Sequence, residues 1–146
     1  MLLAEYPLPD LEATQKLAVS IAPHLRRGDV LALQGELGAG KTEFARLLLR
    51  ALGVMGDVPS PTFTLVQTYE AKDLLISHFD LYRLKSSHEL EELGWEDALS
   101  DGLSLVEWPE RATGRLPEDR LVLTFSLADG KRNCHIEKCG HWAARL

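Results

Sequence analysis

The sequence of 146 residues is poor in basic charge, in cysteine and in long apolar segments. Its 16 Lys and Arg residues are outnumbered by 22 Asp and Glu residues, which gives a formal net charge of −6. The chain therefore lacks the basic excess that drives autonomous nucleic-acid binding. We expect any RNA that it serves to reach it through a partner protein.

No apolar run approaches the roughly 20 residues that a membrane-spanning helix needs. Residues 1–5 also lack the basic region and the apolar length that a signal peptide requires. Both absences lead us to expect a cytoplasmic protein without a membrane association.

Only two cysteines are present, Cys134 and Cys139, and His135 and His141 lie beside them. These four side chains could bind zinc, but their spacing matches no common zinc motif. The ligands of one site are also rarely packed into a single strand. We interpret both cysteines as reduced structural residues.

The rest of the composition is that of an ordinary globular protein, with 45% hydrophobic and 26% charged residues. A chain of this length can bury about two-thirds of the surface that its unfolded form exposes. Internal repeats and low-complexity segments are absent. We therefore predict a single domain over residues 1–146.

The most informative stretch is Gly35-Glu36-Leu37-Gly38-Ala39-Gly40-Lys41-Thr42, which fits the phosphate-loop pattern. The apolar run 30–33 precedes it as a buried strand, and an apolar stripe at helical spacing follows it. In this order, the backbone N–H groups of the loop and the N-terminus of the helix converge on phosphate oxygens. Lys41 would reach the outer phosphates, and the Thr42 hydroxyl would be a ligand of the Mg2+ that bridges them.

Caps, turns and periodicity predict the remaining elements. Asp10 is a plausible N-cap of a helix to about Leu25, and Gly53 ends the helix that follows the loop. Two short helices are expected at 86–93 and 95–100, and the strands at 30–33, 63–69, 74–80, 103–107, 121–127 and 132–139. An extended start (2–8) and a short tail (141–146) complete the chain.

The two hairpin signals, above all Asp129-Gly130, place antiparallel strands beside the parallel ones. The predicted fold class is therefore α/β, a P-loop NTPase-like three-layer fold with a mixed sheet. Its parallel strands lie near the phosphate loop, and antiparallel hairpins are added to them.

Three further features point to the chemistry of a nucleotide site. The segment 54–62 is broken by glycine and proline, and Ser60 and Thr62 are candidates for a switch hydroxyl that senses the terminal phosphate; a rigid proline turn is the other interpretation. Asp80 ends an apolar strand and could serve Mg2+ or orient water. His78, on the same strand face, fits a packed residue better than a base. Glu107 ends a second apolar strand.

The expected nucleotide follows from the absence of a guanine-binding motif. Guanine-specific enzymes of this class use an Asn-Lys-x-Asp motif, whereas the only asparagine here is Asn133, which is followed by Cys134. A conventional GTPase is excluded, and ATP is the expected nucleotide.

Four segments, in their order along the chain, resemble the bacterial TsaE (YjeE) family. They are the phosphate loop, Ser-Pro-Thr-Phe-Thr-Leu-Val at 60–66, His-Phe-Asp-Leu-Tyr-Arg-Leu at 78–84 and Leu-Val-Glu-Trp-Pro-Glu at 105–110. The resemblance runs from Pro7 to about the C-terminal hairpin. Members of this family are the ATPase component of the machinery that makes threonylcarbamoyladenosine beside the anticodon of tRNAs.

The resemblance implies a Mg2+-dependent ATPase that works with two proteins, the transferase TsaD and its inactive relative TsaB, and whose hydrolysis resets the complex. It implies that Lys41 and the loop amides bind phosphates and that Thr42 and Glu107 serve Mg2+. Asp80 is then the candidate for orienting or deprotonating water, with Thr62 as the switch. The division of roles between Asp80 and Glu107 stays open.

Four residues at the edge of the site have less specific signals. Trp108 precedes Pro109, which predicts an extended conformation; it could report on nucleotide, contact a partner or plug the end of the core. Leu11 and Arg132 could approach the adenine end of a nucleotide. Lys131 could do so as well, but for both basic residues a solvated position at the hairpin tip is the favoured interpretation.

Two other functions compete with a partner-dependent ATPase. A nucleotide-gated binding module would use ATP to order residues 54–62 without turnover. A small-molecule kinase would need an acceptor site and usually an arginine-rich lid, whereas the only paired arginines, Arg26 and Arg27, precede the loop.

Overall fold

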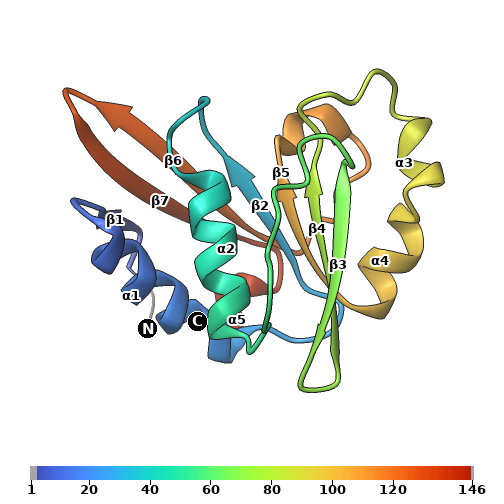
Figure 1. Cartoon of the computed structure of the whole chain (residues 1–146), viewed down its shortest axis with the longest axis horizontal. Helices are drawn as coiled ribbons and strands as arrows, with labels where there is room; N and C mark the ends of the chain where they lie inside the picture. Colours follow the sequence, from blue (N-terminus) through green and yellow to red (C-terminus); the bar gives the residue numbers. More distant parts are fainter. Residues whose placement is uncertain (1–2, 146) are drawn as a thin grey trace.

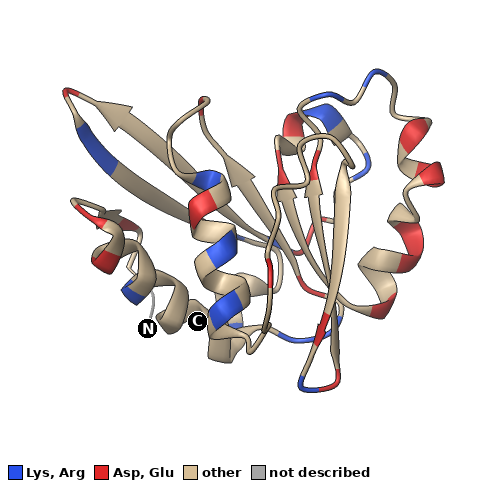
Figure 2. Ribbon diagram, in the orientation of Figure 1, with Lys and Arg blue, Asp and Glu red and all other residues tan. Residues whose placement is uncertain are grey.

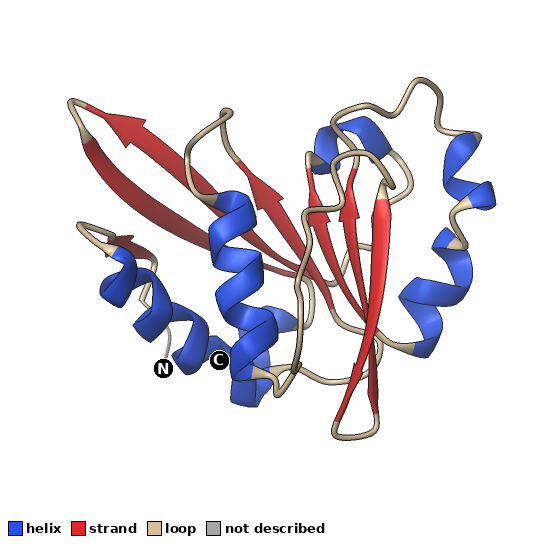
Figure 3. Cartoon of the chain, in the orientation of Figure 1, coloured by secondary structure: helices blue, strands red, loops and turns tan. Residues whose placement is uncertain are grey.

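A computed structural model describes residues 3–145. It has a mixed sheet with helices on both faces, which is the predicted α/β architecture (Figures 1 and 3). Residues 1, 2 and 146 belong to the predicted domain, extended start and tail but lie outside the described range. The described helices are α1 (Leu11–Ile21), α2 (Lys41–Ala51), α3 (Glu89–Glu92), α4 (Trp95–Asp101) and α5 (Trp142–Arg145), with 3-10 turns at Ala22–His24 and Pro109–Ala112.

Within residues 3–145, seven strands form the sheet in the order β1-β7-β6-β2-β5-β4-β3. The central strand β2 is parallel to both β5 and β6, and β4 is parallel to β5. The hairpins β3–β4 and β6–β7 and the short β1 are antiparallel additions at the two edges. The strands are β1 (Glu5–Pro7), β2 (Val30–Gln34), β3 (Val66–Ala71), β4 (Leu74–Asp80), β5 (Leu103–Glu107), β6 (Arg120–Ala128) and β7 (Lys131–Cys139).

Each face of the sheet has its own apolar core, because successive side chains of a strand point to opposite faces. On β4, Ile76 joins the larger core with α1 and α2, whereas Phe79 joins the smaller core with α3 and α4. Phe79 packs edge-on against Trp95, with their ring centroids 5.0 Å apart. The two faces predicted for this strand are therefore confirmed.

Local sequence patterns predict most ends of helices and strands correctly. Asp10 caps α1, since its Oδ1 accepts a hydrogen bond from the Ala13 N–H at 2.9 Å. Asp129 and Gly130 both have positive φ, as the turn of a two-residue hairpin requires. The predicted helix to Leu25 ends earlier, at Ile21, and the chain continues as a 3-10 turn that contains Pro23.

The strand predicted over 63–69 begins only at Val66. Pro61–Leu65 instead closes a turn in which the Leu65 N–H donates to the Pro61 carbonyl at 2.7 Å. Leu65 has a φ of +68°, and Phe63 is 80% exposed. The apolar residues of this segment continue the pattern of a strand, but the chain must turn here to pass the end of β4.

Within the described residues, no helix is long and apolar enough to cross a membrane.

Candidate functional site

The phosphate loop connects β2 to α2, as its pattern predicts, and glycine is needed at both of its ends. Gly35 has a φ of +143°, and a Cβ built there would lie 2.4 Å from the Phe125 carbonyl oxygen. Gly40 has a φ of +112° and is the N-cap residue of α2. The loop therefore lies close against β6 and directs the N-terminus of α2 towards a cleft.

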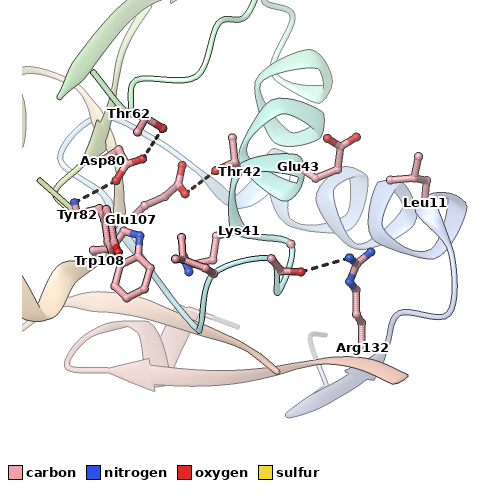
Figure 4. A pocket seen from close by; sticks show the side chains of 13 residues that line it. Leu11, Lys41, Thr42, Glu43, Thr62, Asp80, Tyr82, Glu107, Trp108 and Arg132 are labelled. Atoms are coloured by element: carbon pink, nitrogen blue, oxygen red, sulfur yellow. Dashed lines mark hydrogen bonds between the residues drawn. The ribbon is translucent and has the colours of Figure 1, made fainter. Parts of the chain in front are cut away.

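This cleft has a volume of about 590 Å³ and lies where β4 and β5 end beside the loop (Figure 4). Ligands of open α/β sheets bind at this position, outside the carboxyl ends of the strands. Its lining combines loop, helix and strand-end residues: Leu11, Leu37, Gly38, Gly40, Lys41, Thr42, Glu43, Thr62, Asp80, Tyr82, Glu107, Trp108 and Arg132.

Lys41, the first residue of α2, is buried against its own loop. Its Nζ donates to the carbonyls of Gly35 and Glu36, the latter at 3.0 Å. The Trp108 ring covers it, with Nζ 4.0 Å from the ring centroid. The ammonium group is thus held by neutral acceptors and by an aromatic face.

Burial lowers the pKa of Lys41, because the charged form loses water. The nearby carboxylates of Glu107, Glu110 and Asp80 act in the opposite direction without overcoming that effect.

Glu107 is fully buried, and each of its carboxylate oxygens has a partner. Oε1 accepts from the Thr42 hydroxyl at 2.7 Å, and Oε2 lies 2.6 Å from His78 Nε2. The first contact joins the end of β5 to the start of α2. It brings the two predicted Mg2+ ligands together.

Asp80 lies beside Glu107 in the register of β4 and β5, but it has different partners. Its Oδ2 accepts from the Thr62 hydroxyl at 3.1 Å, and its Oδ1 accepts from the Tyr82 N–H at 3.1 Å. Ser60 and Thr62 share a hydroxyl contact of 2.7 Å. Of the two predicted switch residues, Thr62 lines the cleft directly and Ser60 is joined to it through Thr62.

Trp108 does not have the predicted extended conformation. Its φ of +57° and ψ of +52° are left-handed, which is unusual for a bulky residue. Pro109 disfavours the right-handed helical region, and the tertiary contacts choose between the remaining ones. The turn aims the indole at Lys41 and packs it on Tyr82, with the ring centroids 4.8 Å apart.

Leu11 and Arg132 lie at the other end of the cleft. Arg132 Nη2 donates to the Gly38 carbonyl at 3.2 Å, so its guanidinium contacts the loop (Figure 4). Leu11 and Leu37 are both largely exposed and supply an apolar rim. The structure thus places both residues at the cleft, where Arg132 is exposed near the hairpin tip and contacts the loop.

Residues 8–134 match the family model described as threonylcarbamoyl adenosine biosynthesis protein TsaE. The chain belongs to the TsaE family. All the predicted site residues, from Leu11 to Arg132, lie within the matched segment.

Relatives and a solved structure agree with this assignment. The chain is 43% identical to the TsaE protein of Rickettsia conorii over 127 residues, covering 86% of this chain and 73% of that one. It is 38% identical to the Bacillus subtilis TsaE protein over 118 residues, covering 80% and 73%. The crystal structure of Bacillus subtilis YdiB shares its fold, with a TM-score of 0.82 and 30% identity over 97% of this chain and 89% of that chain.

The oxygen atoms of this TsaE-family cleft suit Mg2+ in the presence of a nucleotide. Thr42, Glu107 and Asp80 offer a hydroxyl and two carboxylates, which are hard ligands. Among residues 3–145, no three or more His, Cys, Asp or Glu side chains are grouped so that they could hold a metal ion. Mg2+ commonly takes one or two carboxylates together with substrate phosphates, so the donor set fits.

Sequence reasoning missed two residues of the site, and it interpreted His78 only as a packed strand residue. Tyr82 and Glu43 line the cleft, and His78 contacts Glu107. Side chains alternate between the two faces along β4, so His78 lies on the same face as Asp80. This pattern could have indicated His78 from the sequence. Tyr82 and Glu43 have no such signal, because their place depends on how the strand ends meet α2.

Proposed function

We propose that the chain is a Mg2+-dependent ATPase required for threonylcarbamoyladenosine modification of tRNA. The observation that carries the proposal is the convergence of four elements on one cleft. The phosphate loop and α2 supply Lys41 and Thr42, and the ends of β4 and β5 supply Asp80 and Glu107. Phosphoryl transfer needs little beyond such positioning and electrostatic stabilisation.

The loop amides and Lys41 bind the phosphates in this proposal. An anionic phosphate is a better partner for Lys41 than the neutral carbonyls that hold it, because the Lys41 side chain is buried. The apolar rim of Leu11 and Leu37, with Arg132 beside it, receives the adenosine end.

Thr42 and Glu107 hold Mg2+, since they already contact one another at the start of α2. When bound, Mg2+ neutralises part of the phosphate charge. Asp80 accepts a proton from, or orients, the attacking water, and the Thr62 hydroxyl fixes its orientation. Through these contacts, Thr62 and Ser60 connect the glycine- and proline-broken segment 54–62 to the presence of nucleotide in the cleft.

TsaD and TsaB are the proposed partners, and hydrolysis resets the complex between cycles. The charge distribution supports an indirect role for tRNA. Acidic side chains dominate α3 and α4 (Figure 2), and the whole chain carries a net charge of −6. A direct complex with RNA is unfavourable for such a surface.

A nucleotide-gated module without turnover is the second candidate, favoured by the contact between Thr62 and Asp80. That contact lets nucleotide bias the loop whether or not hydrolysis follows. A small-molecule kinase has less support. The paired Arg26 and Arg27 line a separate cavity with Ala51 and Leu52, at the far end of α2 from the phosphate loop.

The test is phosphate release from Mg-ATP by the purified chain, alone and with TsaD and TsaB. We expect slow release alone, faster release with both partners, and none with Lys41→Ala. Lys16→Ala is the matched control, because Lys16 is exposed on α1 and pairs with the exposed Glu12. Tight ATP binding without release in either condition would replace the ATPase with the nucleotide-gated module.

A further inference from the structure

His78 is a polar exception in an apolar row of the sheet. The registers of the central strands align Leu121, Leu31, Leu105 and His78 across β6, β2, β5 and β4. All four side chains are buried, with at most 1% exposed. A leucine at position 78 would continue the row towards α2, so apolar packing alone does not account for the imidazole.

The imidazole also has an unfavourable feature. Its Nδ1 is buried and has no hydrogen-bond partner among residues 3–145. A buried polar atom without a partner destabilises a fold, and such atoms in native proteins commonly have a functional reason. The favourable contact of the ring is the one from Nε2 to Glu107.

That contact constrains a carboxylate at the centre of the proposed site. Nε2 lies 2.6 Å from Oε2 of Glu107, while Oε1 receives the Thr42 hydroxyl at 2.7 Å. Because an ionised carboxylate only accepts hydrogen bonds, Nε2 is the donor. One oxygen is therefore held inside the protein, and the other is turned to the start of α2.

We propose that His78 is a positioning residue that orients the Glu107 carboxylate for Mg2+ binding beside Thr42. The inference rests on the proposed function and adds to it a residue that does not itself touch nucleotide or metal. Partners of this kind typically change metal affinity about 10- to 100-fold when they are removed.

Three substitutions separate positioning from packing. His78→Leu keeps an apolar side chain in the row and removes the donor. His78→Gln places an amide donor near the position of Nε2, whereas His78→Asn places one near Nδ1, too short to reach Glu107. The readout is the ratio of ADP affinities measured with Mg2+ and with EDTA, together with the unfolding temperature in metal-free and nucleotide-free buffer.

We expect His78→Leu and His78→Asn to reduce that ratio about tenfold or more, and His78→Gln to stay within about threefold of the parent chain. ADP affinity in EDTA should be the same in all four proteins, and His78→Leu should unfold at a lower temperature than His78→Gln, because leucine leaves the buried Oε2 of Glu107 without a donor. The inference is overturned if His78→Leu keeps the parent ratio, or if His78→Gln loses as much as His78→Leu. A parent chain that binds no ADP in either buffer would instead refute the proposed function itself, and the inference with it.

Discussion

Glu107 and Asp80 are neighbours at the ends of β5 and β4, and their hydrogen bonds give them different tasks. Glu107 is joined to Thr42, and Asp80 is joined to Thr62. We therefore expect Glu107→Ala to weaken Mg2+-dependent ADP binding by tenfold or more, at least about 1.4 kcal/mol. Asp80→Ala should retain that binding and lose turnover by about 10²- to 10⁴-fold.

Titration of ADP with and without Mg2+, followed by phosphate-release assays, measures both effects. The opposite pattern, with binding lost in the Asp80 variant and retained in the Glu107 variant, would exchange the two roles.

Cys134 provides a second test for a single residue. Burial raises the pKa of its thiol from 9.0 to about 12. The folded protein thus keeps this proton to higher pH than the unfolded chain, so stability is unaffected below pH 9 and falls as the pH rises towards 12. At pH 10.5 the loss should reach about 2 kcal/mol relative to pH 8.

Urea unfolding at the two pH values measures this loss. Burial also raises the pKa of Tyr69, so part of the decrease belongs to that residue. The decrease should be smaller in Cys134→Ala than in the parent chain. An equal decrease in both proteins would contradict the assignment.

At the scale of elements, β3 contributes one unfavourable group to the larger core. The Tyr69 hydroxyl is buried and has no hydrogen-bond partner within residues 3–145. Its ring packs against the larger core. We expect Tyr69→Phe to keep this packing, remove the orphan hydroxyl and raise the free energy of unfolding by about 1 kcal/mol.

Tyr6→Phe is the matched control, because the Tyr6 hydroxyl accepts from the Leu3 N–H at 2.8 Å. That substitution should lower stability by about 0.5 to 1 kcal/mol. Chemical denaturation of the two variants would count against the interpretation if both changed stability in the same direction.

At the scale of the whole molecule, α5 connects the C-terminal end to the turn before β2. Arg145 forms two contacts with the Asp29 carboxylate, at 2.6 and 3.0 Å, and lies 3.8 Å from the centroid of the Trp142 ring. Both charged side chains are mostly buried. We expect Arg145→Ala to lower stability by about 2 kcal/mol, because it leaves Asp29 without its charged partner.

The exposed pair of Arg27 and Asp101, 3.7 Å apart, is the matched control. Arg27→Ala should change stability by less than about 0.5 kcal/mol. Similar losses in the two variants, measured by thermal or urea unfolding, would mean that the C-terminal ion pair is no stronger than a surface one.

Local chemistry explains why much of this protein is predictable. The phosphate loop, the cap at Asp10 and the turn at Asp129-Gly130 depend on residues within a few positions of one another, and all three formed as expected. The apolar strands that end in Asp80 and Glu107 follow the same logic. Their residue patterns predict that each strand ends in an acid, whereas the parallel pairing that sets the two acids side by side is seen only in the structure.

Other features depend on residues far apart in the chain, where a local pattern carries no information. The late start of β3 and the left-handed Trp108 follow from how loops pass the strand ends. The same is true of the ion pair between Asp29 and Arg145, which belongs to a tail expected only as a short extension. The alternating pattern of residues 74–80 predicted the correct sheet face for His78, but its partner Glu107 lies 29 positions away. Folding alone brought those two side chains together, because the parallel register of β4 and β5 sets their distance.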